Sequence, residues 1–332
     1  MAVPSIWLDR CLPDEFVAEL SGGGRLRWLV DFASMHRETL NTDLVLVGES
    51  KRGRRSKVHL YGGTAGLISV AWLGADRVQL GFRDTVTFAE VPFEPDWRKP
   101  RTLDGMAALG PDVVAGLEAK ATLAALSHGK EGPVQVAVMR GGPGWTALDR
   151  EVVPQYLSEA DRRRLQDEFQ RPIALTRQAV AASNPWARNW KPKGNELDCL
   201  AVDAAGDLLA VEVKTGDAND LEQAPLQVAF YVQMLERCLS ESPVTLAALR
   251  RTAHQRASIG LCGEAPPIAD HPRVRPVVAV SEPVSKRAAN RWPAVLEASR
   301  EAGGPLAPEV WLVGPGGAVS RTGGSVLPGP PD

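Results

Sequence analysis

The sequence predicts an α/β protein built as two domains. An α+β domain over residues 1–150 precedes a domain over 155–318 that has a mixed central sheet with helices on both faces. The length of 332 residues exceeds one typical domain. Runs that alternate apolar and polar residues, as strands do, recur in both halves, and segments of helical spacing lie between them. The segment 145–157 reads as the boundary, and the Gly- and Pro-rich residues 319–332 predict a flexible tail.

The first half shows helical spacing around Leu26, Trp28 and Phe32, and β-type patterns after it. Strands are predicted over 43–49, 57–61, 66–73, 77–82 and 135–140, and a further helix over 111–127. This half resembles no family that would give it a role. We therefore expect it to contact substrate, a protein partner or a second copy of the chain.

The second half alternates helices and strands more regularly. A helix over 158–182, interrupted at Pro172, leads into two strands and a long helix between Asn195 and Leu239. An irregular stretch over 240–272 should follow. The predicted end is a strand over 274–282, a helix over 285–303 and a strand over 309–314.

Composition excludes several classes of protein. The net charge is −2, so bulk charge neither demands nor excludes a nucleic-acid partner. The four cysteines have no CxxC spacing, which argues against a zinc knuckle or an iron–sulfur cluster. We find neither a signal peptide nor an apolar run of membrane-spanning length, and we expect a cytoplasmic protein with no membrane contact.

The segment from Gly194 to Gly216 predicts a hairpin whose two strands carry charged residues on one face. A three-residue turn at Ala204–Gly206, with Gly206 in the left-handed conformation, connects the strands. Facing residues then have numbers that sum to 410. Asp198 should oppose Glu212, Glu196 should oppose Lys214, and all four side chains should share one face because strand side chains alternate.

Two carboxylates placed opposite each other repel, since their Cβ atoms lie roughly 5 Å apart. A divalent cation would offset that repulsion, and Mg²⁺ prefers carboxylate oxygens. Lys214 could then orient a water or stabilise charge on a phosphate. The alternative is a solvated outer face on which Glu196 and Lys214 form an ordinary ion pair. The apolar character of both strands favours an interior position instead.

The helix predicted over 221–239 places Gln227 and Tyr231 on one face, because they are four residues apart. Pro225 fits its first turn. The alternative for these two side chains is a surface glutamine and a half-buried tyrosine on an ordinary amphipathic helix.

Together these residues resemble the PD-(D/E)XK nuclease superfamily, and more narrowly its RecB-like branch. The pattern is an acid on one strand (Asp198), then Glu212-Val213-Lys214 on the next, then Gln227-x-x-x-Tyr231 on the following helix. The resemblance implies a restriction-endonuclease-like fold. It also implies Mg²⁺, replaceable by Mn²⁺, on Asp198, Glu212 and the Val213 carbonyl. Lys214 would orient the attacking water, and Gln227 and Tyr231 would support the site or touch the nucleic-acid backbone.

The same resemblance implies a further acidic metal ligand on the preceding helix. Glu168 is the candidate, with Glu159 and Glu196 as competitors. The residue before Asp198 is Leu197, where the family often has proline.

Residues 155–195 hold eight basic and four acidic side chains, an excess that predicts contact with phosphates. The residues expected to bind nucleic acid are Arg188, Lys191 and Lys193. Trp186 and Trp190 could stack on bases, or could serve packing alone.

The sequence therefore predicts a metal-dependent enzyme that hydrolyses phosphodiester bonds of nucleic acid, with DNA favoured. The alternative is a nuclease-like fold without activity that binds nucleic acid or a protein partner. Metal dependence separates the two.

Overall fold

A computed structural model describes residues 4–48, 55–82, 94–127, 130–191, 196–301 and 307–328. The chain forms two compact units. Unit 1 comprises residues 1–8, 140–246 and 266–332, and unit 2 comprises 9–139 and 247–265. The expected division into 1–150 and 155–318 is corrected in two places. Strand β7 (Trp145–Val152) pairs with a strand of unit 1, and the chain returns to unit 2 after Leu246.

Unit 2 contains a five-stranded antiparallel sheet in the order β2-β3-β4-β5-β6. Its strands are β2 (Thr42–Val47), β3 (Lys57–Gly62), β4 (Ala65–Trp72), β5 (Arg77–Phe82) and β6 (Arg101–Thr102). The other elements are α1 (Asp14–Leu20), α2 (Arg27–Met35), η2 (Pro95–Arg98) and α3 (Leu103–Ser127). The sheet and helices share one apolar core that includes Phe16, Leu29 and Leu60. The strands predicted from 43 to 82 are confirmed.

Three predicted elements are wrong or incomplete here. The expected strand over 135–140 lies in a helix, α4 (Glu131–Met139), whose residues are almost all buried. A short apolar run that is buried all round has no periodicity to tell helix from strand. Helix α3 begins at Leu103 and contains Pro111. The stretch expected to be irregular holds α7 (Pro243–Ser258), which is rich in good helix formers and starts at a proline.

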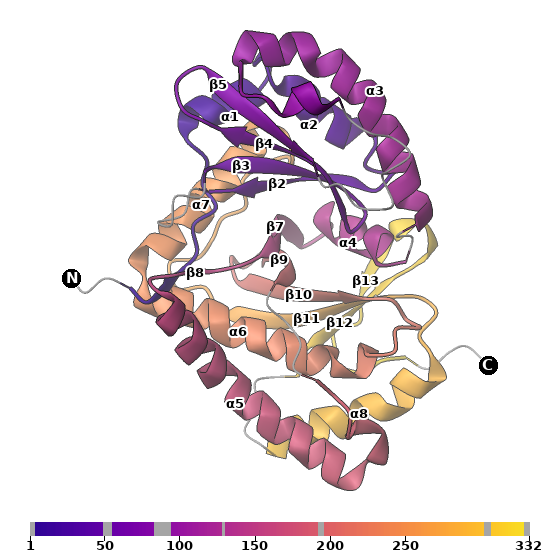
Figure 1. Ribbon diagram of the computed structural model, residues 1–332. Coiled ribbons are helices and arrows are strands. Elements are labelled where there is room, and N and C mark those ends of the chain that lie inside the picture. The colour runs from indigo at the N-terminus through magenta and orange to yellow at the C-terminus, as the bar shows by residue number, and fades with distance from the viewer. Residues whose placement is uncertain are drawn as a thin grey trace. The chain divides into compact units, whose positions relative to one another are not determined.

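Unit 1 is built on a six-stranded mixed sheet in the order β13-β12-β11-β10-β9-β7 (Figure 1). The strands after β7 are β9 (Leu197–Asp203), β10 (Leu208–Lys214), β11 (Val274–Ser281), β12 (Glu309–Val313) and β13 (Val319–Arg321). β10, β11 and β12 run parallel, and the other neighbours are antiparallel. A separate antiparallel pair joins β1 (Ile6–Trp7) to β8 (Gln155–Tyr156). The α/β class with a mixed sheet is confirmed, and the hairpin strands β9 and β10 lie inside the sheet.

The helical elements of unit 1 are α5 (Glu159–Ser183), η3 (Pro185–Ala187), η4 (Leu221–Gln223), α6 (Ala224–Glu241), α8 (Lys286–Glu301) and η5 (Pro315–Gly317). Helix α6 packs on β10 and β11, and α5 and α8 pack against α6 and each other (Figure 1). Among the described elements of this unit, the helices therefore gather on the α6 side, whereas we expected them on both faces.

Helix α5 continues through Pro172, where the sequence predicted an interruption. Phe169 and Ile173 are buried on either side of the proline, and the Phe169 ring meets Phe230 of α6 edge-on at 5.8 Å. This packing outweighs a helix-interior cost of about 3 kcal/mol for proline. Tertiary contacts thus decide the continuity of the helix.

The hairpin turn forms as predicted. Gly206 has φ of 84°, and the ladder pairs Leu208 with Val202 through to Val211 with Cys199, all with the expected sum. The Asp203 carboxylate accepts hydrogen bonds from the backbone N–H groups of Ala205 (2.9 Å) and Asp207 (3.0 Å). These bonds fix the turn and with it the register of both strands.

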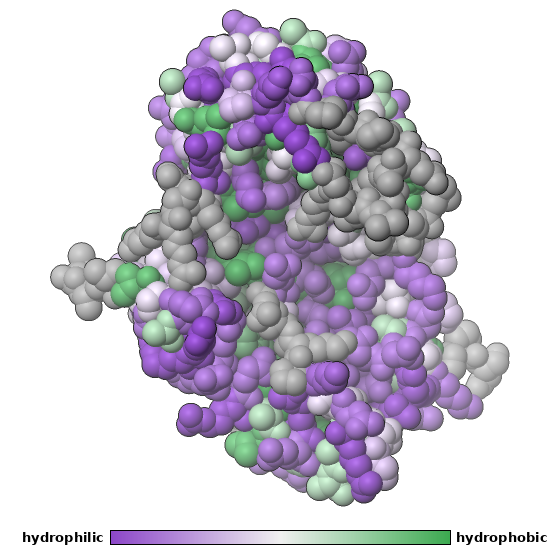
Figure 2. Space-filling view, in the orientation of Figure 1, coloured by the Kyte–Doolittle hydropathy of each residue, from purple (hydrophilic) through white to green (hydrophobic). Residues whose placement is uncertain are grey.

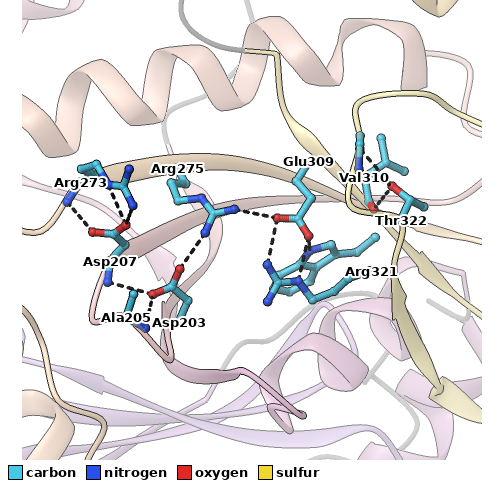
Figure 3. Close-up of polar contacts among 11 residues, drawn as sticks. Asp203, Ala205, Asp207, Arg273, Arg275, Glu309, Val310, Arg321 and Thr322 are labelled. Carbon is cyan, nitrogen blue, oxygen red and sulfur yellow. Dashed lines mark hydrogen bonds and ion pairs between the residues drawn. The ribbon is translucent and has the colours of Figure 1, made fainter.

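A chain of ion pairs ties this turn to the neighbouring strands (Figure 3). Arg273 donates to Asp207, and Arg275 bridges Asp203 at 2.7 Å and Glu309 at 3.1 Å. Arg321 of β13 donates to the same Glu309. The network joins the hairpin to β11, β12 and β13.

The expected flexible tail over 319–332 is wrong for residues 319–328. Strand β13 pairs with β12, the Trp292 indole donates to the Ser325 carbonyl at 2.7 Å, and Leu327 is buried. Gly and Pro in this stretch mark turns of a packed segment. Residues 329–332 lie outside the described part of the chain.

No helix in the described ranges combines the length and apolar character needed to cross a membrane. In Figure 2 hydrophilic residues cover most of the visible surface over α5, α6 and α8. Large exposed hydrophobic side chains of unit 1 are scattered along the chain, as at Val153, Leu175 and Val326.

Candidate functional site

The two hairpin strands separate at the end remote from the turn. Their ladder stops at Val211 and Cys199, while β9 stays paired with β7 as far as Leu197, and β10 stays paired with β11 as far as Lys214. Past this point the Asp198 carboxylate accepts a hydrogen bond from the Val213 N–H at 2.7 Å. A side chain thus replaces the next ladder bond.

This separation corrects part of the predicted register. Asp198 and Glu212 are not a ladder pair, and neither are Glu196 and Lys214. The two carboxylates still meet, because the charge of Asp198 and a hydrogen bond to it raise the pKa of Glu212. The strands part because Asp198 takes the backbone donor that a paired residue would have used.

Glu212 and Lys214 form a buried pair on β10. The Lys214 ammonium donates to Glu212 Oε1 at 2.7 Å. Glu212 is only 2% exposed and Lys214 only 7%. The alternative of a solvated outer face is therefore wrong. Glu212 Oε2 is also buried and has no hydrogen-bond partner among the described residues. An acceptor of this kind is costly unless something positive reaches it.

The electrostatics of the cluster favour a shared proton or a bound cation. Burial, and then the Asp198 carboxylate, raise the pKa of Glu212 to about 8. Burial alone would lower the pKa of Lys214, but the Glu212 and Asp198 carboxylates outweigh it and raise that pKa. Near neutral pH the two carboxyl groups together hold one proton, and their single negative charge balances Lys214.

Helix α6 adds Tyr231 to the same cluster. Burial raises the pKa of Tyr231, and the charges of Glu212 and Asp198 raise it further. Gln227 lies one turn earlier, is buried, and has a side-chain oxygen with no partner in the described ranges. The alternative of a surface glutamine and a half-buried tyrosine is therefore wrong, since both are buried.

The oxygen atoms present fit a hard divalent cation. Asp198, the unpartnered Glu212 oxygen and the Gln227 oxygen are ligands of the type that Mg²⁺ takes. No group of three or more His, Cys, Asp or Glu side chains arranged for a metal occurs in the described part of the chain. Two carboxylates with backbone and water oxygens are the donor set that a Mg²⁺ ion commonly uses. The role of the Val213 carbonyl stays a prediction.

Glu168 is engaged elsewhere. Its half-exposed carboxylate lies 3.7 Å from Arg237 and 3.8 Å from Arg164. Its competitor Glu159 pairs with Arg162. These pairings favour arginine partners for the two acids, and a metal-ligand role for Glu168 stays a prediction.

The loop after β10 contains residues that sequence reasoning missed. A Cβ on Gly216 would lie 2.2 Å from the Pro283 carbonyl oxygen, so only glycine fits there. Asp220 contributes to the raised pKa of Lys214, and Glu222 is buried with Arg291 at 3.1 Å. The glycine after Val-Lys-Thr was a visible signal, but the two acids become notable only through the fold.

The predicted nucleic-acid residues precede β9. Arg188 and Lys191 are exposed, and Lys193 lies outside the described residues. Trp186 and Trp190 sit beside them with ring centroids 5.3 Å apart.

Comparison with protein-family models, with curated proteins and with solved structures gives no significant match to this chain. Functional inference therefore depends on the geometry of the cluster.

Proposed function

We propose that this chain is a metal-dependent nuclease of the PD-(D/E)XK type, with a restriction-endonuclease-like core in unit 1. One observation supports it above the others. The half-buried Asp198 lies next to the buried pair of Glu212 and Lys214, and one Glu212 oxygen has no partner among the described residues. A purely structural ion pair would satisfy both oxygens, because an unpartnered buried acceptor costs about 1–3 kcal/mol.

Asp198 and Glu212 are the residues that would hold Mg²⁺, with the Val213 carbonyl as a further oxygen. When bound, Mg²⁺ polarises a phosphate oxygen and lowers the pKa of a coordinated water. Lys214 already donates to Glu212 at 2.7 Å, so its ammonium lies within reach of any group next to that carboxylate. It can hold the attacking water in position or donate to a phosphate oxygen. Tyr231 is buried and close enough to the two acids for their charges to raise its pKa.

A second candidate is a nuclease-like module that binds nucleic acid or a protein without cleaving it. The direct Lys214–Glu212 contact and the engagement of Glu168 by arginines favour this candidate. Lys214 alone balances the shared negative charge of the pair. Metal binding separates the two candidates.

The test is cleavage of labelled single-stranded and duplex DNA and RNA with Mg²⁺, with Mn²⁺ and with a chelator. Asp198→Asn, Glu212→Gln and Lys214→Met should each lower the rate by about 100-fold or more, as expected for groups that stabilise developing charge. Asp167→Asn, which removes an exposed carboxylate from α5, should retain full activity. Glu168→Gln should also retain activity.

Equal cleavage by the wild-type chain with and without chelator would reject the metal role. Metal binding absent from calorimetry, together with intact substrates, would favour the binding module.

A further inference from the structure

We infer that Trp186 and Trp190, with Arg188 and Lys191, form a surface that binds nucleic acid with unpaired bases. The inference rests on the proposed function and specifies its substrate class. It concerns the segment that follows helix α5 and contains η3.

The two tryptophans are held close together by a short turn. The backbone N–H of Trp190 donates to the Ala187 carbonyl, and the two ring centroids lie 5.3 Å apart at an interplanar angle of 60°. Both rings are half-buried, and the Arg188 and Lys191 side chains next to them are exposed. Partly exposed indoles beside cations provide what an unpaired nucleotide needs, a surface for base stacking and a charge for its phosphate.

Arg291 of α8 contacts the Trp186 ring and is itself anchored. Its guanidinium lies 4.7 Å from the centre of the Trp186 ring and donates to Glu222 at 3.1 Å. Glu222 is 1% exposed, so the arginine is anchored to a buried acid. The Trp186 ring therefore rests on an anchored cation and not in an apolar core, which limits the explanation by hydrophobic packing. An anchored ring loses little conformational entropy when a base stacks on it.

Two segments of chain link the residues of this surface to the candidate catalytic residues. Glu222 belongs to η4, which leads directly into α6 with Gln227 and Tyr231. Lys191 precedes Asp198 by seven residues, a span of at most roughly 25 Å of extended chain. The tryptophan surface and the acids therefore lie within about 25 Å of each other along the chain.

Charge and stacking together favour unpaired bases over a duplex. In a duplex the faces of the bases are already stacked, so the two rings could add little. The segment from Pro185 to Lys191 carries two basic and no acidic residues. Two phosphate contacts predict a weak dependence on salt, with a slope of about −1.4 in log K against log salt concentration.

The experiment measures binding without metal, on the chain with Asp198→Asn so that no cleavage occurs. Fluorescence anisotropy of labelled 20-nucleotide oligo(dT) and oligo(rU), and of a 20-base-pair DNA duplex, gives the affinities. Trp190→Ala should weaken binding of both single strands by about 5- to 150-fold, the effect of losing one stacked base. Trp190→Phe should retain most of the affinity. The control Trp97→Phe alters a tryptophan of unit 2 and should bind as the parent does.

The double variant Arg188→Gln, Lys191→Gln should reduce the salt slope by about 1.4 and leave the stacking contribution in place. It keeps the test informative if Trp190→Ala does not fold. Unchanged affinity in Trp190→Ala, an equal loss for duplex and single strands, or no binding by the parent chain would each overturn the inference. Because no cleavage is measured, single-strand binding that depends on Trp190 can be established even if the wild-type chain proves inactive.

Discussion

Replacing Lys214 by methionine should destabilise the fold and at the same time make it bind Mg²⁺ more tightly. Lys214 and Glu212 are 2.7 Å apart, with side chains 9% and 3% exposed. Removing one partner of a buried ion pair costs about 3–5 kcal/mol. We expect the lower end, about 3 kcal/mol, because Asp198 and Glu212 share a proton and leave only one negative charge without a partner.

The loss should depend on pH in a defined direction. As pH falls, the remaining carboxylate of the pair becomes protonated, the buried charge disappears, and the cost of the substitution shrinks. Mg²⁺ should replace the missing cation. At a concentration 100 times its dissociation constant it should restore about 2.7 kcal/mol.

The assay is urea unfolding of wild type, Lys214→Met and the exposed control Lys191→Met, each at pH 6 and pH 8 and with and without Mg²⁺. Lys191→Met should unfold as the wild type does, because Lys191 is exposed. Wild-type stability in Lys214→Met would refute the buried-pair reasoning. A stability loss that Mg²⁺ does not reduce would refute the assignment of Asp198 and Glu212 as metal ligands.

Three further predictions concern protons and packing. Mg²⁺ binding at pH 7 should release up to one proton, and this release should vanish well above the raised pKa of Glu212. Calorimetry in buffers of different ionisation enthalpy measures the number of protons released. Constant release at all pH values would contradict the shared proton. Because the pKa of Glu212 in the folded chain lies above its ordinary value of 4.5, metal-free stability should fall as pH rises from about 4.5 toward 8, and Glu212→Gln should remove this slope in urea titrations. Gly216→Ala should cost about 1–3 kcal/mol, since its Cβ would lie 2.2 Å from the Pro283 oxygen, whereas Gly324→Ala meets nothing within 4 Å and should be nearly neutral in the same assay.

Sequence periodicity determined most of the secondary structure and the hairpin at the centre of unit 1. Alternation gave the strands, and the glycine at the third turn position gave a register that the ladder follows from Leu208 to Val211. These features depend on neighbouring residues only, so the chain itself contains the information. The same alternation predicted that Asp198, Glu212 and Lys214 lie on one face of the hairpin.

Only the tertiary structure decided where the hairpin strands separate and which partners the buried side chains take. The strands part beyond Cys199 because Asp198 captures the Val213 N–H, a choice between a side chain and a backbone partner that spacing does not reveal. Burial all round left the apolar run in α4 without a periodicity that marks it as a helix, and packing against Phe230 kept α5 continuous through Pro172. Glu168 turned to Arg237, while Glu222 and Arg291 met across 69 residues of chain. Contacts between distant segments set each of these outcomes, because burial and partner choice belong to the folded chain as a whole.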